Sequence, residues 1–192
     1  KSLMEFTLYI RLTWVFLLAI LTGDAVNAQV YINEFLASNA TVTRDPDFDE
    51  YADWIELYNA GSSSVNLNGY CLTDDLSEPD KWCITQDLVI AAKGYALIWT
   101  DGKNTGLHAG FKISQLGEEI GLFSPALVLL DSVSFSTQAI DISTGRSPDG
   151  SGNWMLFTTP TPGSSNSTTA YKGMVYHVPE FSVTGGLYKT SQ

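Results

Sequence analysis

Short apolar runs alternate with turn-forming residues along the chain from residue 30 onward. Each run has the length of an ordinary strand and is rich in β-branched and aromatic side chains. The predicted strands span residues 30–36, 53–58, 70–72, 88–90, 95–99, 119–123 and 127–135. Turn sequences such as Asn68-Gly69 and Asp101-Gly102 separate them. Many short strands without helical periodicity between them predict an all-β fold, an antiparallel sandwich or barrel.

The first 28 residues carry a different pattern. Lys1 and Arg11 precede an apolar core at residues 12–21, which ends before Gly23 and is followed by small residues at 25–28. A charged start, an apolar core shorter than the roughly 20 residues of a bilayer span, and a small-residue exit are typical of a secretory signal. We therefore predict that residues 1–28 are a signal peptide, that the protein is secreted or held at the cell surface, and that no membrane span remains after processing. The alternative interpretation is a membrane anchor or a buried strand.

Composition is consistent with a folded, acidic domain. Hydrophobic residues make up 44% of the chain and charged residues 16%, which is enough apolar material for a packed core. The formal net charge is −11. Such a surface repels phosphate backbones and anionic lipids, which argues against nucleic-acid or membrane-surface partners.

The two cysteines, Cys71 and Cys83, lie on either side of a polar, turn-rich stretch. In an exported protein an even pair at hairpin spacing predicts a disulfide. A structural metal site would need two further soft ligands nearby, and the sequence around the pair contains none.

The composition changes again after residue 157. Proline, glycine and hydroxyl residues dominate 158–169, as in linkers, and a new strand–turn–strand pattern follows. We predict a β-sandwich domain over residues 29–166, a linker over 167–176, and the start of a truncated second β domain over 177–192.

The order of motifs within the sandwich resembles the prokaryotic, secreted form of the lamin-tail domain. The motifs are Ile32-Asn-Glu-Phe35, Asp53-Trp-Ile-Glu-Leu-Tyr-Asn59, Leu67-Asn-Gly-Tyr70, Gly117-Glu-Glu-Ile-Gly-Leu122, Gly145-Arg-Ser-Pro-Asp-Gly150 and Pro160-Thr-Pro-Gly163 with Asn166. The resemblance covers residues 30–166 and implies an immunoglobulin-like antiparallel β-sandwich. Tyr70 stands where the family more often has Trp, and the two cysteines are additions.

The end of the chain carries a second resemblance. Residues 179–188 are similar to the opening of a chitobiase-like C-terminal β repeat. Bacterial lamin-tail modules are often followed by such repeats and by a CotH-type kinase-like domain, so the resemblance implies that a longer parent protein continues in this way.

An acidic loop before residue 53 is the candidate metal site. Asp45, Asp47 and Asp49 alternate with other residues, and the spacing to Asp53 and Glu56 follows the ligand positions of an EF-hand. The sixth position lacks the required glycine and the last positions are a predicted strand, which argues against an EF-hand. We therefore predict a looser, weak calcium site formed by Asp45, Asp47 and Asp49. The alternative is a solvated acidic loop.

Catalytic chemistry has less support. His108 lies between glycines and is expected at the surface, and no serine motif marks an activated nucleophile. Glu34 and Glu56 are expected to bond backbone or loop groups, and Arg146 to pair with Asp149. Of the tryptophans, Trp82 in the polar hairpin is the candidate exposed, ligand-facing ring.

These observations predict a non-catalytic secreted module of a larger extracellular or cell-surface protein, acting in targeting or interaction with a protein or glycan. The alternatives are a carbohydrate-binding module and an accessory domain of an enzyme whose catalytic domain lies beyond Gln192.

The signal-peptide assignment makes one testable prediction. Exported protein should begin at Gln29, because Val26 and Ala28 are small enough for the cleavage site. N-terminal sequencing or intact mass of secreted material checks this. A mature protein that retains residues 14–21 would indicate an anchor.

Overall fold

The computed structural model describes residues 30–173, which form twelve β-strands and no helix. The strands are β1 (Val30–Leu36), β2 (Trp54–Asn59), β3 (Val65–Asn66), β4 (Cys71–Thr73), β5 (Trp82–Cys83), β6 (Val89–Ile90), β7 (Tyr95–Trp99), β8 (Gly117–Phe123), β9 (Leu129–Ser136), β10 (Ser143–Arg146), β11 (Trp154–Phe157) and β12 (Ala170–Tyr171). All seven predicted strands are present, with ends that differ by at most two residues. The predicted signal peptide and the predicted second β domain lie outside the described residues.

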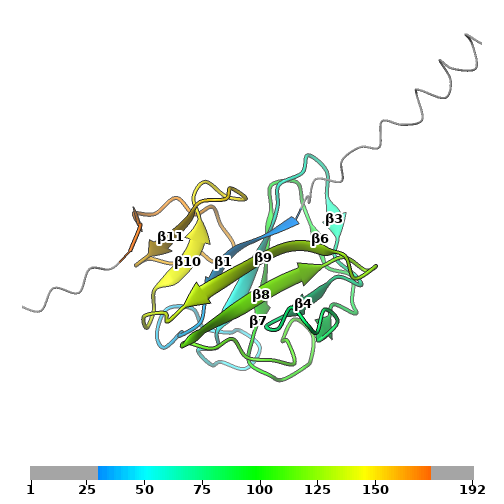
Figure 1. The fold of residues 1–192 in the computed structure, drawn as a ribbon, viewed down its shortest axis with the longest axis horizontal. Helices are drawn as coiled ribbons and strands as arrows, with labels where there is room; N and C mark the ends of the chain where they lie inside the picture. The colour runs from blue at the N-terminus through cyan, green and yellow to red at the C-terminus, as the bar shows by residue number, and fades with distance from the viewer. Residues whose placement is uncertain (1–29, 174–192) are drawn as a thin grey trace, which may run out of the picture.

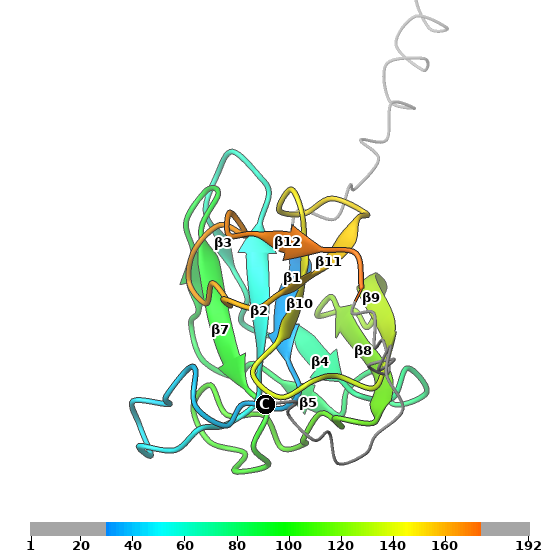
Figure 2. The same ribbon diagram turned by 90° about the vertical axis from the view of Figure 1, so that its left-hand side faces the viewer.

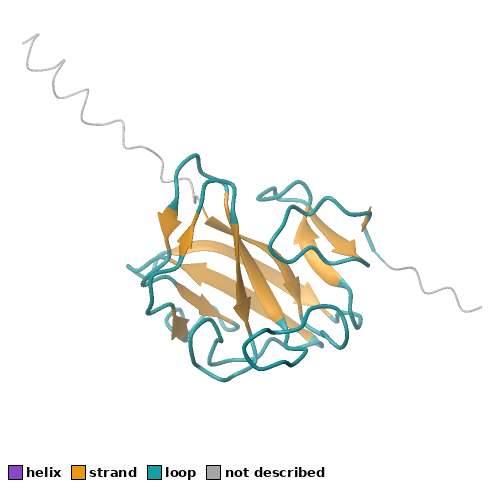
Figure 3. Cartoon of the chain, turned by 180° about the vertical axis from the view of Figure 1, so that it is seen from behind, coloured by secondary structure: helices purple, strands orange, loops and turns teal. Residues whose placement is uncertain are grey.

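The strands assemble into two main sheets packed face to face (Figures 1 and 3). One has the order β12-β11-β10-β1-β2-β7 and the other the order β5-β4-β8-β9. A small ribbon of β3 and β6 lies at one end. Every pairing between the named strands is antiparallel, which confirms the all-β prediction. Within residues 30–173 there is no helix that could cross a membrane.

A β-bulge in β1 decides which side chains enter the core. Ile32 pairs with Leu57 but Glu34 pairs with Glu56, so one extra residue, Asn33, stands in β1. The extra residue shifts the alternation of side chains by one position. Ile32 and Phe35 both point into the core between the sheets, where they join Ile55, Leu57, Ile120 and Leu122. Asn33, Glu34 and Glu56 are left on the opposite, outer face of the six-stranded sheet.

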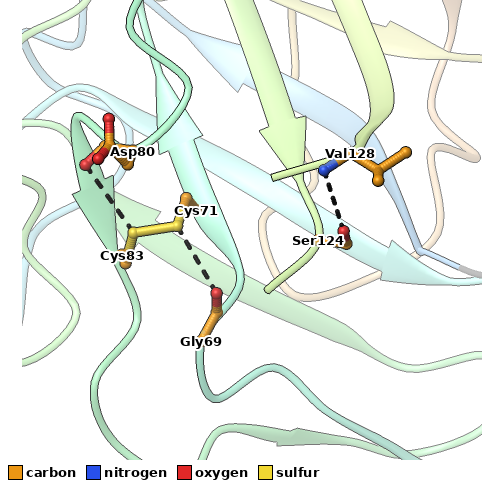
Figure 4. Close-up of a disulfide and its surroundings, with 6 residues drawn as sticks. All are labelled: Gly69, Cys71, Asp80, Cys83, Ser124 and Val128. Carbon is orange, nitrogen blue, oxygen red and sulfur yellow. Dashed lines mark hydrogen bonds between the residues drawn. A yellow bond between two sulfur atoms is a disulfide. The ribbon is translucent and has the colours of Figure 1, made fainter. Parts of the chain in front are cut away.

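The β4–β5 hairpin carries the disulfide (Figure 4). Cys71 lies directly opposite Cys83 in the antiparallel pairing, their Cα atoms are 4.0 Å apart, and their sulfurs are bonded. This confirms the predicted disulfide. The next pair in the hairpin is Leu72 with Trp82, and the Trp82 ring packs into the core with only 7% of its surface exposed. The prediction that Trp82 faces a ligand is therefore wrong: strand pairing turns the ring inward although its sequence neighbours are polar.

The polar segment after β11 is packed against the domain. Residues 158–169 cross the outer face of the six-stranded sheet, and Figure 2 shows this orange segment passing in front of β2. β12 lies within the range predicted to be a linker, yet Tyr171 and Ala170 pair with Leu156 and Phe157 of β11. Sequence composition predicted an open connection here because the segment has no apolar side chains to bury. Hydrogen bonds hold it in place instead.

Reduction of the Cys71–Cys83 disulfide is expected to lower the free energy of unfolding by about 2–3 kcal/mol, because the bond closes a short loop in the unfolded chain. The two cysteines are 12 residues apart. Urea unfolding with and without a reductant measures the difference. A Cys71→Ser/Cys83→Ser variant is the control, since the reductant should leave its unfolding midpoint unchanged. Equal midpoints for the unmodified protein in both conditions would contradict the expectation.

Candidate functional site

Two loops meet at the end of the sandwich where β7 finishes and β2 begins. They comprise residues 37–53 and 100–116, and they lie at the bottom of Figure 2. The backbone amide of Thr100 donates to the carbonyl of Asp53 at 2.8 Å and so joins the two loops at their base. Asn39 is buried and its side chain donates to the carbonyls of Thr43 and Ala52, which closes the first loop on itself. This fixed geometry brings the acidic residues of one loop toward the other.

Asp45 is fully buried at the centre of the first loop. One carboxylate oxygen, Oδ1, accepts a hydrogen bond from the amide of Asp47 at 2.9 Å and lies 3.9 Å from Nε2 of His108. The other oxygen, Oδ2, is buried and has no hydrogen-bond partner among the described residues. The Asp47 side chain is 68% exposed, and its Oδ2 lies 3.3 Å from the same histidine nitrogen.

His108 is buried, contrary to the expectation of a surface histidine. Its ring packs edge-on against Phe48 and stacks on Trp99. Nδ1 lies 2.9 Å from Oδ2 of Asp101, which also accepts a bond of 2.7 Å from Nζ of Lys103. Burial alone would raise the pKa of Asp101, but the hydrogen bonds from Lys103 and His108 outweigh it and lower the pKa. Asp101 is therefore a carboxylate that holds the imidazole ring in one orientation.

The structure brings together only part of the predicted calcium set. Asp45 and Asp47 both face Nε2 of His108, whereas Asp49 is 75% exposed and forms an ion pair with Arg44 at 2.9 Å. The residues that complete the cluster, Asp101 and His108, come from a loop more than 50 positions later in the chain. Spacing within the acidic loop carries no information about them. The only signal in the sequence is a lone histidine in the glycine-flanked loop at 106–110.

A second polar cluster lies on the outer face of the six-stranded sheet. Glu34 and Glu56 are fully buried and stand opposite each other on β1 and β2. Glu34 accepts hydrogen bonds from the Ser143 hydroxyl and from the amide and hydroxyl of Thr161. Glu56 accepts one from Asn33 Nδ2 at 3.1 Å and one from the amide of Gly163 at 2.6 Å. The expectation that both glutamates bond backbone or loop groups is confirmed.

The environment of these glutamates favours their protonated forms. Burial raises the pKa of Glu34, although hydrogen bonds from Ser143 and Thr161 oppose the shift. Burial also raises the pKa of Glu56 to about 8, against the hydrogen bonds from Asn33 and Gly163, and the negative charge of Glu34 adds to the rise. Two carboxylates buried side by side do not both ionise readily, so the pair retains a proton near neutral pH.

Asp149 and Asn166 complete this outer cluster. Asp149 accepts bonds from the Tyr95 hydroxyl at 2.7 Å, from Asn33 Nδ2 at 3.1 Å and from the amide of Asn166 at 3.0 Å. Burial works to raise the pKa of Asp149, but these bonds and one from Ser165 lower it. The Asn166 side chain donates to the carbonyls of Asn33 and Arg146. The cluster thus fastens residues 161–166 to the sheet.

Arg146 does not pair with Asp149, and that prediction is wrong. Its Nη2 contacts both carboxylate oxygens of Asp131, at 2.8 and 2.9 Å, and its Nε donates to the carbonyl of Ile32. The Arg146 side chain extends from β10 toward β9 of the other sheet, where Asp131 lies. The Asp149 side chain points the other way, toward the outer face of the six-stranded sheet. Arg146 also lies over the ring of Trp154, 4.3 Å from its centroid.

Comparison with known families identifies the fold. The profile of the Lamin Tail Domain family matches residues 24–137, more than half of the chain. The chain belongs to the lamin tail domain family. Its immunoglobulin-like architecture agrees with the two antiparallel sheets described above. No curated protein matches the chain significantly.

Most residues of the two polar clusters lie within the range that the family profile matches. All four members of the loop cluster, Asp45, Asp47, Asp101 and His108, fall inside the matched range of the lamin tail domain. The two buried glutamates also fall inside it, whereas their partners Thr161 and Gly163 lie beyond residue 137. In this chain both buried glutamates therefore accept hydrogen bonds from the segment after the matched range, in addition to the one that Asn33 donates to Glu56.

Glu56 makes the stability of the domain depend on pH. Its folded-state pKa of about 8 lies above the ordinary value of 4.5, so the folded protein holds a proton that the unfolded chain releases. The resulting stabilisation is complete below pH 4.5 and is lost as pH rises toward 8. We expect the free energy of unfolding to fall by an amount on the order of 3 kcal/mol between pH 5 and pH 8.

Denaturant unfolding at several pH values measures this dependence. Glu56→Gln, which cannot ionise, should flatten the slope whatever its absolute stability. Glu78→Gln is the control, because Glu78 has a 58% exposed side chain in the β4–β5 connection and should leave the slope unchanged. A stability that rises from pH 5 to pH 8, or a Glu56→Gln slope equal to that of the unmodified chain, would overturn the assignment.

Proposed function

We propose that this lamin tail domain is an exported, non-catalytic module that connects a larger extracellular or cell-surface protein to a protein partner. The observation that carries the proposal is the turn between β8 and β9. Leu127 and Val128 in this turn and Leu129 at the start of β9 are three consecutive aliphatic residues that are 45%, 60% and 47% exposed. Clustered apolar side chains on the surface of a soluble domain are typical of contact sites for other proteins.

The turn holds these side chains in a defined position. Ser124 accepts a bond from the Leu127 amide at 2.8 Å, and its hydroxyl accepts one from the Val128 amide at 3.2 Å. In Figure 4 the Val128 side chain points away from Ser124. Leu127 has a φ of 56°, a left-handed conformation that is unfavourable for a large side chain. Glycine would adopt this conformation without strain. The presence of leucine instead supports a role for its side chain in a contact.

The assignment as non-catalytic is supported by what the buried carboxylates do. Glu34 and Glu56 are neighbouring carboxylates on β1 and β2, and paired carboxylates are what glycoside cleavage uses. Both accept hydrogen bonds from the covering segment, at Thr161 and Gly163. Their carboxylate oxygens accept hydrogen bonds that attach this segment to the sheet, which is a structural role.

Export is supported by two independent features. The disulfide between Cys71 and Cys83 is of a kind that persists mainly in oxidising compartments. The sequence of residues 1–28 has the pattern of a secretory signal. Both features agree with a domain that folds outside the cytosol.

A protein partner is favoured over a glycan. The aromatic ring expected to stack on a sugar, Trp82, is in the core. The side chains exposed at the β8–β9 turn are aliphatic, and these suit an apolar protein surface. We further propose that the module precedes a chitobiase-like β repeat and a CotH-type kinase-like domain. The similarity of residues 179–188 supports this arrangement, and reading the coding sequence past Gln192 tests it.

The partner proposal is tested by binding of the labelled chain to intact cells of its source organism. A Leu127→Gly/Val128→Ser variant should lose most of this binding. Its melting temperature should not fall, because glycine adopts a positive φ without strain. Ile140→Ser is the matched control, since Ile140 is 61% exposed at another place on the surface.

Equal binding by the double variant and the unmodified chain would overturn the proposed contact surface. A glycan array provides the second measurement. Saturable binding to a polysaccharide that the double variant retains would assign a carbohydrate-binding function instead.

A further inference from the structure

Both ring nitrogens of His108 face carboxylates. Nδ1 lies 2.9 Å from Oδ2 of Asp101, while Nε2 lies 3.3 Å from Oδ2 of Asp47 and 3.9 Å from Oδ1 of Asp45. In a neutral imidazole only one nitrogen carries a proton. If that proton is on Nδ1, toward Asp101, the lone pair of Nε2 faces two negatively charged groups. This arrangement calls for a positive species between Nε2, Asp45 and Asp47: either a second proton or a metal ion.

The state of Asp45 favours the metal ion. Asp45 is fully buried, and its Oδ2 has no hydrogen-bond partner within the described part of the chain. Buried carboxylate oxygens in folded proteins are otherwise bonded, so an unpartnered one requires an explanation. A proton on Nε2 of His108 could be donated to Oδ2 of Asp47 or to Oδ1 of Asp45. It would leave Oδ2 of Asp45 without a hydrogen-bond partner. Asp45, Asp101 and His108 each offer a ligand atom within 4.8 Å of the other two, which is close enough to surround one ion.

We infer that Asp45, Asp47 and His108 form a binding site for a divalent first-row transition-metal ion, with Asp101 as the group that orients the histidine. Ligand atoms about 2.1 Å from a zinc ion at a tetrahedral angle lie ~3.4 Å from each other. The separations of 3.9 Å from Nε2 to Asp45 and 3.3 Å from Nε2 to Asp47 are close to that value, and Asp47, which is exposed, would turn toward Asp45 to complete the set.

Asp101 has the role that an outer carboxylate has in many histidine–metal sites. Metal-bound histidines commonly donate their second ring N–H to a carboxylate, which fixes the tautomer and the ring direction. Oδ2 of Asp101 is already occupied by Nδ1 of His108 and by Nζ of Lys103. It therefore directs Nε2 toward Asp45 and Asp47 without itself being needed as a ligand.

The donor set selects the kind of ion. A nitrogen ligand with two carboxylates suits Zn²⁺ and neighbouring transition metals, whereas Ca²⁺ takes six to eight oxygens. The calcium expected from the acidic loop alone is thus replaced by a transition metal once His108 joins the cluster. Because Asp47 is 68% exposed, the ion has a path from solvent and a coordination position open to water or to a carboxylate of another molecule.

Such an ion would connect the two end loops directly. Asp47 and His108 are separated by 61 positions in the chain and belong to different loops. Bound metal would restrict both loops at once and stabilise the folded state, increasingly so as the free metal concentration rises above Kd.

The test is isothermal titration of the whole chain, stripped with a chelator, with Zn²⁺. We use the His177→Gln variant as the parent, because His108 is then the only histidine in the sequence. One Zn²⁺ should bind per chain, the melting temperature should rise with Zn²⁺, and millimolar Ca²⁺ should not displace it. The ¹⁵N resonance of Nε2 of His108 should shift on binding while Nδ1 stays protonated.

Two exposed aspartates of the same loop provide the matched pair. Asp47→Asn should weaken Zn²⁺ binding at least tenfold, and Asp49→Asn should leave it unchanged, since Asp49 pairs with Arg44 instead. Neither side chain is buried, so both variants are expected to fold. The inference is overturned if the parent binds no Zn²⁺. Equal weakening by both substitutions, or an unchanged His108 resonance, would overturn it as well.

Discussion

The two buried glutamates that face each other on the outer side of the six-stranded sheet require hydrogen-bond donors from other parts of the chain. Glu34 and Glu56 are carried to the same spot by the pairing of β1 with β2 and cannot be left without donors. The sheet alone supplies few of these donors. The amide and hydroxyl of Thr161 and the amide of Gly163 supply the others. A segment with almost no apolar side chains therefore acts as part of the folded domain.

The sequence predicts the apolar parts of this domain better than the polar parts that are buried through hydrogen bonds. Apolar alternation identified the strands that line the core, and the hairpin position of Cys71 and Cys83 identified the disulfide. β10 escaped notice because its residues, Ser143–Arg146, are polar or glycine. They are buried through hydrogen bonds and strand pairing, a kind of burial that hydrophobicity does not report. For the same reason, the polar composition of residues 158–169 predicts an open linker although hydrogen bonds hold this segment against the sheet.

Errors in individual side chains have a related cause. The polar neighbours of Trp82 predict a surface position, yet pairing of its strand with Leu72 turns the ring inward. The sequence places Asp149 as the carboxylate nearest to Arg146, yet the direction of β10 brings Arg146 to Asp131. His108 looked isolated because its partners are a distant loop away. In each case the residue type was informative, but its neighbour in space was set by strand register and loop closure, which one sequence does not display.

The position of β1 in its sheet has a consequence for how the chain acquires its structure. β1 is the first described strand, but it lies between β2 and β10, which arrive about 20 and about 110 residues later. A chain that emerges from its N-terminus can pair β1 with β2 early, while the other edge of β1 waits for β10. During that interval the edge is open to any extended segment of another chain. The bulge at Asn33 interrupts the regular backbone pattern of this strand and makes it a poor template for such mispairing.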